Sequence, residues 1–238
     1  MNKLSENFIF SFFVSLVMVM LDALYHLATE TAVHINYVAV KFTVIFLVVF
    51  LVVYWVGKGV TDGIFTSVAG PVIFYVYYIF ANATLNREIF KIDENFGYIF
   101  VHIAALLIAY FSVYNSWTMK KGSPVAKSII YSFIVSISIF GLITAYKLSY
   151  VQYTTHNEEI NARVLNFKSS IYLFSMLFLL SFLSNFFIRS KNIEMAVLIG
   201  GAAIIIYFAG RNITEGLIGI AASSIPVYLS KLYLKIIK

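Results

Sequence analysis

Three ionisable side chains near the N-terminus, Asp22, His26 and Glu30, are spaced four residues apart. At this spacing they lie on one face of an α-helix, and Ser11 and Ser15 extend that face toward the start of the chain. Carboxylates and imidazoles can exchange protons or bind cations, and histidine titrates near neutral pH. The first segment therefore predicts a polar helix face whose chemistry suits the handling of protons or ions.

Other ionisable residues are predicted at the same level of the membrane when positions are counted along the apolar segments described below. Ionisable groups inside a membrane are costly and usually face the interior of a helix bundle, so each is a candidate for function. We expect these residues to form one polar chamber near the outer face, as a substrate or proton site of a small transporter or channel-like protein. The candidates are Asp22, His26, Lys41, His102, Arg211 and Glu215.

Two alternatives to transport remain open. In one, Asp22, His26 and His102 bind a divalent metal such as zinc, and the protein is a membrane-embedded hydrolase that acts on lipid. No HExxH or second paired-histidine motif supports that interpretation. In the other, pairs such as Asp22–Lys41 or Arg211–Glu215 only fix the register of the helices, and the protein is a scaffold or accessory subunit without chemistry.

The composition places these residues in a membrane protein. Of the 238 residues, 61% are hydrophobic and 12% charged, and the mean hydropathy is +0.89. An ordinary soluble domain has about 25% charged residues, so we expect lipid to cover the apolar surface. The net charge of +6 fits topology signals beside membrane spans, and no nucleic-acid partner is predicted. The absence of cysteine excludes disulfides, thiolate metal sites and cysteine nucleophiles.

Apolar segments long enough to cross a bilayer, about 20 residues each, predict an all-α polytopic transmembrane bundle with about eight spans. Residues 1–238 are expected to form a single integral membrane domain. Six long spans are followed by two short ones, for which a re-entrant hairpin is the alternative. An uncleaved first span is favoured over a signal peptide because polar residues continue its helix face. The predicted spans are Asn7–Ala28, Asn36–Val56, Val60–Ala81, Phe96–Trp117, Pro124–Leu148, Phe167–Ile188, Ile193–Ala209 and Ile213–Tyr233.

The distribution of basic residues predicts the orientation. With eight spans, ten of the 17 Lys and Arg residues lie on the side of the N-terminus. Basic residues are more frequent in cytoplasmic loops, so we expect a protein of the cell membrane with both termini in the cytoplasm.

The last two predicted spans are rich in Gly, Ala and Ser, as in the run Gly200–Ala203. Small residues allow helices to approach closely. This predicts tight packing of these two spans and a surface through which the chain could form a homo-oligomer. The sequence does not indicate which small solute, ion or lipid would be the substrate.

Overall fold

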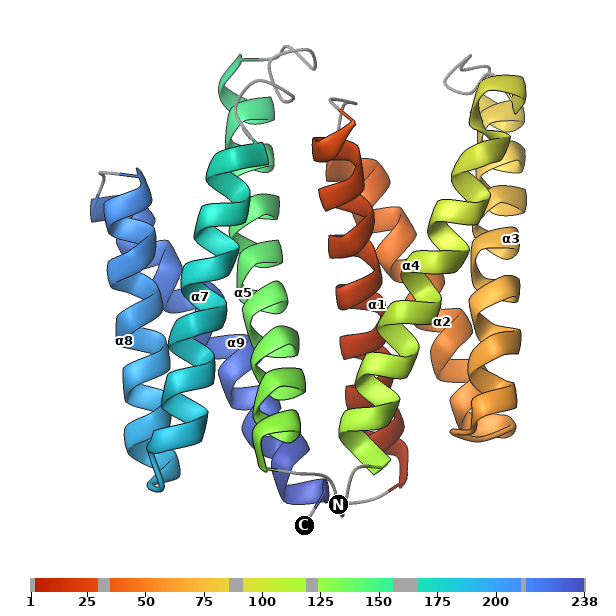
Figure 1. The fold of residues 1–238 in the computed structure, drawn as a ribbon. Helices are drawn as coiled ribbons and strands as arrows, with labels where there is room; N and C mark the ends of the chain where they lie inside the picture. The colour runs from red at the N-terminus through yellow and green to blue at the C-terminus, as the bar shows by residue number, and fades with distance from the viewer. Residues whose placement is uncertain are drawn as a thin grey trace. The chain divides into compact units, whose positions relative to one another are not determined.

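The fold of the chain is all-helical in the residues that the computed structural model describes, which are 3–29, 35–85, 92–118, 124–155, 167–210 and 213–237. These residues form eight long helices, which are drawn in Figure 1, and the predicted fold class is confirmed. They are α1 (Lys3–Ala28), α2 (Ile35–Trp55), α3 (Val60–Leu85), α4 (Ile92–Thr118), α5 (Pro124–Thr155), α7 (Phe167–Phe187), α8 (Lys191–Gly210) and α9 (Ile213–Ile237).

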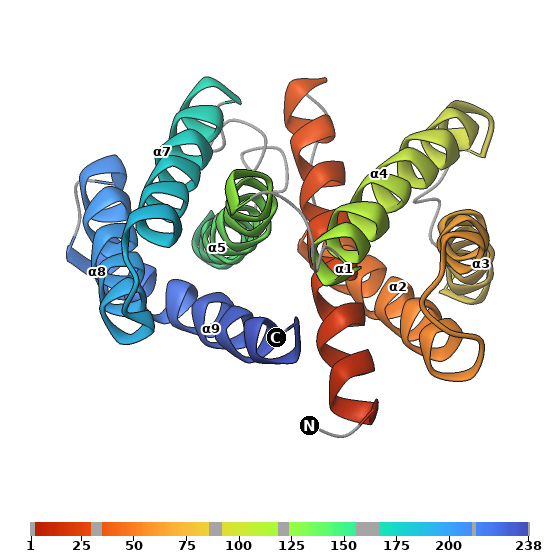
Figure 2. The ribbon, with the colours of Figure 1, turned by 60° about the horizontal axis from the view of Figure 1, so that its bottom comes forward.

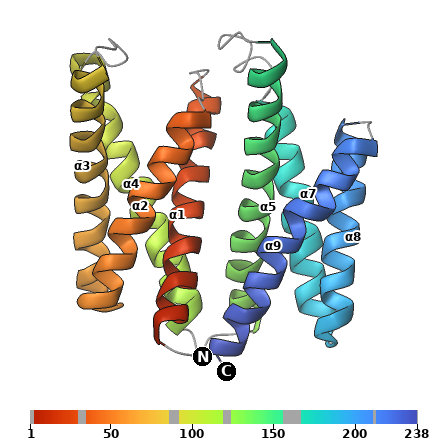
Figure 3. The same ribbon diagram turned by 180° about the vertical axis from the view of Figure 1, so that it is seen from behind.

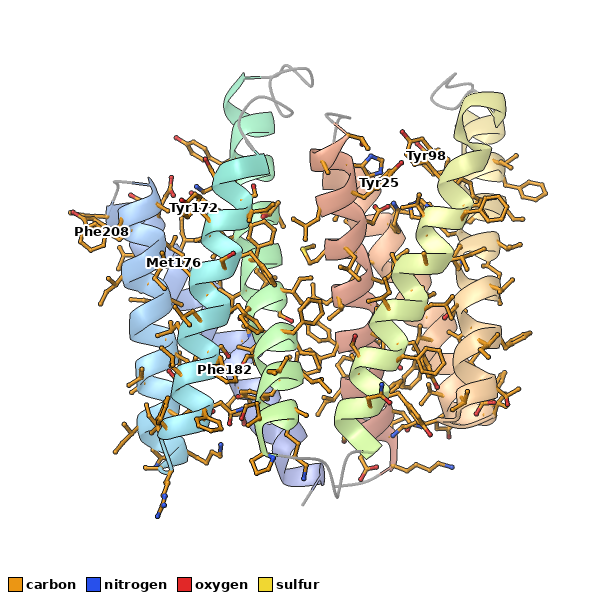
Figure 4. The ribbon with its side chains drawn as sticks, viewed as in Figure 1. Tyr25, Tyr98, Tyr172, Met176, Phe182 and Phe208 are labelled. Atoms are coloured by element: carbon orange, nitrogen blue, oxygen red, sulfur yellow. The ribbon has the colours of Figure 1, made fainter. Side chains whose placement is uncertain are left out.

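Seven of these helices are long and apolar enough to cross a membrane, and the apolar part of α9, Ile213–Leu229, is shorter. Because α8 has 20 residues and α9 has 25, the C-terminal segment forms two full-length helices. Large apolar side chains also cover the outside, where only lipid can shield them. Figure 4 shows Phe208 projecting away from α8, where it is 71% exposed, and Tyr172 on α7 is 62% exposed. The chain is therefore a multi-pass integral membrane protein.

The chain divides into two compact units. Unit 1 comprises Met1–Ala23 and Asn36–Tyr114, and unit 2 comprises Leu24–Ile35 and Asn115–Lys238. Most of α1, α2 and α4 and the whole of α3 belong to unit 1, whereas α5, α7, α8 and α9 belong to unit 2.

Unit 2 is a four-helix bundle in which each helix packs against two others. The packed pairs are α5 with α7, α7 with α8, α8 with α9, and α9 with α5. Figure 2 shows these four helices arranged around a common interior, and Figure 3 shows α9 slanting between α5 and α8. Their core includes Val135 and Phe140 of α5, Leu177 of α7, Ala202 of α8 and Val227 of α9, all at most 1% exposed.

The predicted tight packing of the last two spans is confirmed by the space around Gly219 of α9. A Cβ atom at this position would lie 2.8 Å from Cδ1 of Ile206 and 3.2 Å from the Cα atom of Ala203, both on α8. Only glycine therefore allows α9 to approach α8 this closely. Homo-oligomer formation through these helices stays a prediction.

In unit 1, α1 lies beside α2 and α4 (Figure 2), and α3 packs against α2 and α4. A Cβ atom at Gly70 of α3 would lie 2.9 Å from Leu106 on α4 and 3.2 Å from Ile45 on α2. The missing side chain lets α3 come close to both helices, one turn before Phe74, and the helix continues through Pro71. Gly70 thus helps to place the aromatic residues of α3 in the interior of unit 1.

The connection between α2 and α3 is a short turn whose backbone requires glycine. Gly57 has a φ of 143°, a conformation that other residues rarely adopt. Its backbone N–H donates to the carbonyl of Val52 at 3.2 Å, which satisfies a carbonyl at the end of α2. Asp62, in the first turn of α3, is placed where a carboxylate favours the start of a helix. These local signals explain why the predicted boundary between the two spans is accurate.

Candidate functional site

Three buried ionisable side chains meet inside unit 1, one from each of three helices. Asp22 comes from α1, Lys41 from α2 and His102 from α4, and the three residues are 1%, 0% and 1% exposed, respectively. Each lies within an apolar helix, where an ionisable group is rare and costly. We call these three residues the buried cluster.

Each residue of the buried cluster has a polar atom within hydrogen-bond distance of each of the other two residues. Nζ of Lys41 donates to Oδ2 of Asp22 at 2.5 Å, and Nε2 of His102 lies 2.6 Å from Oδ1 of the same carboxylate. The Lys41 and His102 nitrogens are 2.7 Å apart. The carboxylate therefore bridges an ammonium group and an imidazole, each at its own oxygen.

This geometry gives the imidazole two ways to bond. If Nε2 of His102 carries the proton, it donates to Asp22, and if Nε2 is bare, it accepts from Lys41. With a neutral imidazole, the charges of the buried cluster sum to zero. One more proton on the ring would give a net positive charge inside the membrane. A small change in protonation is thus coupled to the hydrogen bonds that hold three helices together.

Aromatic side chains of α3 cover the buried cluster. Nζ of Lys41 is 5.5 Å from the centroid of the Phe74 ring, within the range of a cation–π contact. The His102 ring lies 6.2 Å from the Phe74 ring and 5.5 Å from the Tyr75 ring. All four helices of unit 1 therefore contribute to the site, and the wall that α3 supplies excludes water from the ammonium.

The other side of His102 lacks a protein partner. Its Nδ1 atom is buried, and no described residue forms a hydrogen bond with it. A buried polar atom of this kind is usually satisfied by water or by a ligand. Tyr98 precedes His102 by one turn of α4 and lies near the end of that helix in Figure 4.

No protein-family model, curated protein or solved structure matches this chain. The function has to be argued from the residues of the buried cluster and of the helices around it.

The remaining predicted site residues have different environments. His26 follows Asp22 by one turn of α1 and is partly exposed. Glu215 lies in unit 2, where its carboxylate is 3.0 Å from Nζ of Lys147 on α5. Arg211 lies outside the described residues. The structure thus brings together Asp22, Lys41 and His102.

Among the residues that the structure describes, the side chains of Asp22, His26 and His102 form a group that could hold a metal ion. A carboxylate and two imidazoles are suitable zinc ligands. However, the Lys41 ammonium lies 2.5 Å from an oxygen of Asp22 and 2.7 Å from a ring nitrogen of His102. A metal ion bound by that oxygen and that nitrogen would have to take the place of the ammonium, since two positive charges so close together would repel each other. A metal would therefore require Lys41 to lose its proton or to move away.

Two features of the interior were not predicted from the sequence. Phe74 and Tyr75 belong to an aromatic run in the middle of α3, away from the helix ends where interfacial aromatic residues are expected. Glu194, in the first turn of α8, is 2% exposed and accepts a hydrogen bond from Lys191 at 2.5 Å. It resembles any acid at the start of a helix, so its burial left no signal in the sequence.

Proposed function

We propose that this protein is a small transporter or channel-like protein that moves protons across a membrane. Protons would be exchanged at Asp22, Lys41 and His102. The observation that carries the proposal is the mutual contact of three buried ionisable groups from three helices. Such groups at membrane depth commonly belong to proton relays in pumps and carriers.

The chemistry of the buried cluster suits this role. His102 can accept or donate through the same nitrogen, so a proton arriving at the site changes which partner the ring bonds. Because Asp22 and Lys41 carry opposite charges, the site is neutral overall before a proton arrives and carries one positive charge while it holds that proton. Transfer of a proton would then shift hydrogen bonds between α1, α2 and α4.

A direct measurement is proton movement into proteoliposomes. The purified chain is reconstituted in vesicles that contain a pH-sensitive dye, and a potassium diffusion potential with valinomycin drives protons inward. We expect acidification faster than in protein-free vesicles, and a return to the protein-free rate for Asp22→Asn. Equal rates with wild-type protein and without protein would refute the proposal.

Glu194 offers a matched control for this experiment. It is a buried carboxylate that also pairs with a lysine, but it lies in unit 2. Glu194→Gln makes the same kind of chemical change as Asp22→Asn, and we expect it to leave proton movement unchanged. If both variants reduced the rate equally, loss of folding rather than loss of a proton site would explain the effect.

Metal-dependent lipid hydrolysis is the second candidate, because a metal-binding combination of residues is present on α1 and α4. It predicts stoichiometric zinc in the purified protein and release of products from lipid vesicles that a chelator abolishes. Proton movement without bound metal would favour transport over this alternative.

A further inference from the structure

Two serines on α1, Ser11 and Ser15, are fully buried without a hydrogen-bond partner for their hydroxyl groups. Both are 0% exposed, and neither Oγ atom has a partner among the residues that the structure describes. Leaving a buried polar group unpaired costs about 1–3 kcal/mol. These two hydroxyls therefore need a partner other than the described residues, and water is the usual one.

Four other buried or partly buried hydroxyls among the described residues are satisfied by the backbone of their own helix. A serine or threonine in a helix can donate to the carbonyl four residues earlier, and the described examples do so at 2.6–2.7 Å. They are Thr66 to Asp62, Ser67 to Gly63, Ser138 to Ile134 and Ser223 to Gly219. Ser11 and Ser15 do not form this bond, so their hydroxyls point elsewhere. Ser132 and Ser136 of α5 share this property in unit 2 at the same spacing, but only the α1 hydroxyls lead to Asp22.

The unpartnered hydroxyls lie on the same face of α1 as the buried cluster. At about 100° per residue, Asn7, Ser11, Ser15 and Asp22 fall within an arc of about 80°. Asn7 is 1% exposed, and its side-chain nitrogen is 3.5 Å from the carbonyl oxygen of Val53 on α2. Both ends of this polar face therefore contact α2, one through Val53 and the other through the lysine of the buried cluster.

This face extends over about three quarters of the thickness of the hydrocarbon core of a membrane. From Asn7 to Asp22 the helix rises about 22 Å, at about 1.5 Å per residue, and the hydrocarbon core is about 30 Å thick. Polar groups along α1 thus begin near one end of the helix and reach the buried cluster near the other. Water in contact with Ser11 and Ser15 would satisfy their hydroxyls and continue toward Asp22.

We infer that Ser11 and Ser15 line a water-filled path along α1 by which protons reach the buried cluster. This inference rests on the proposed proton movement and names its route. Ser11 and Ser15 hold the water, and Asp22 receives the proton at the end of the path.

A short apolar stretch of α1 between Ser15 and Asp22, which we call the apolar step, interrupts the path. Met18 and Val19, each 1% exposed, lie between Ser15 and Asp22, which are about 10 Å apart along the helix axis. Protons cross this step only while water bridges it. The step therefore limits the rate and separates the serine end of the path from the buried cluster.

The first test measures water at the two serines without reference to transport. Because the chain has no cysteine, Ser11→Cys and Ser15→Cys each introduce the single thiol of the protein with little change in shape. In reconstituted membranes, a small water-soluble methanethiosulfonate reagent should modify both. Ser67→Cys is the matched control, since Ser67 is also 0% exposed but bonds to its own helix.

We expect both α1 thiols to react at least about tenfold faster than the Ser67→Cys thiol, because only a hydrated thiol ionises readily. Equal, slow modification at all three positions would overturn the inference. Ser11 and Ser15 would then be small residues that only allow helices to pack closely.

The second test measures proton movement in Ser11→Ala/Ser15→Ala vesicles, with Ser67→Ala as the control. We expect the double variant to lose most of the wild-type rate and the control to keep it. If Asp22→Asn abolishes proton movement and the double serine variant does not, the path is wrong while the proposed function stands. If wild-type protein moves no protons, the proposed function fails whatever the thiols show.

Discussion

The ion pair between Asp22 and Lys41 should respond to substitution in an unusual way. The Asp22 side chain is 2% exposed and the Lys41 side chain is 0% exposed. Replacing either residue alone therefore leaves the charge of the other one buried without its partner. Replacing both removes the charge altogether. We therefore predict that Asp22→Asn and Lys41→Met each destabilise the protein strongly, and that the double variant is more stable than either single variant.

The loss in the free energy of unfolding is limited because a buried charge without a partner can be neutralised by taking up or releasing a proton. A buried carboxylate without its cation can take up a proton, which at pH 7 costs about 4 kcal/mol for an ordinary aspartate pKa of about 3.9. A buried ammonium without its anion can release a proton, at about 4.6 kcal/mol for an ordinary lysine pKa of about 10.4. These costs limit each single loss to about 3–5 kcal/mol, the range found when one partner of a buried pair is removed. The double variant should lose less than about 1 kcal/mol or gain stability.

The pH dependence has opposite sign in the two single variants. In Lys41→Met, the folded state holds one proton on Asp22 or on His102 beside it, and the unfolded state releases that proton when its histidine titrates, so stability falls as the pH rises above about 6.5. In Asp22→Asn, the folded state lacks a proton that the unfolded lysine keeps, so stability rises with pH up to about 10. The double variant should show neither slope.

Equilibrium unfolding in mixed micelles of a nonionic detergent and sodium dodecyl sulfate, between about pH 5 and pH 9, measures these losses and slopes. The control is Lys147→Met, whose partner Glu215 is 3.0 Å away but 24% exposed. Partly hydrated ion pairs contribute about 1 kcal/mol or less. Equal losses for Lys41→Met and Lys147→Met, or the same pH slope in both single variants of the buried pair, would refute the reasoning.

Three further predictions concern other parts of the protein. Gly219→Ala should reduce the free energy of unfolding by about 1–3 kcal/mol because its Cβ atom would lie 2.8 Å from a side chain of α8. Gly200→Ala, whose Cβ atom meets nothing within 4 Å, should be neutral or stabilise by up to about 1 kcal/mol. Burial lowers the pKa of Lys58 from its ordinary 10.5, against the opposing charge of Glu6. The folded state therefore binds fewer protons than the unfolded state just below pH 10.5, stability rises with pH there, and thermal unfolding of Lys58→Gln should lack that rise. Elemental analysis should find no stoichiometric zinc in wild-type protein, because the Lys41 ammonium already contacts Asp22 and His102, and one zinc per chain would contradict this.

The helices could be predicted from the sequence because a membrane span is recognised by the length of its apolar run. The starts of α3 at Val60, α5 at Pro124, α7 at Phe167 and α9 at Ile213 were predicted at the residue where the structure has them. The ends were less accurate, since α5 continues to Thr155, seven residues past the predicted end. Hydropathy detects the edge of the lipid, whereas a helix can extend beyond it into water.

The buried cluster was only partly predictable. Counting residues placed Asp22, Lys41 and His102 at a similar depth, but depth does not determine which side chains touch. The rotation of each helix about its axis decides that, and it depends on packing contacts such as that of Gly70 with Leu106. Aromatic residues carry no charge, so the role of Phe74 on α3 was missed.

The separation of Asp22 and Lys41 has a consequence for how the chain enters a bilayer during synthesis. The two residues are 19 positions apart and lie on consecutive helices, so neither is neutralised when its own helix emerges from the ribosome. A single charge costs about 2.5–3.5 kcal/mol at the centre of an inserting helix and less toward its ends, where Asp22 and Lys41 lie. Release of α1 and α2 into lipid as one hairpin avoids both costs. The insertion machinery should therefore retain α1 until α2 has arrived.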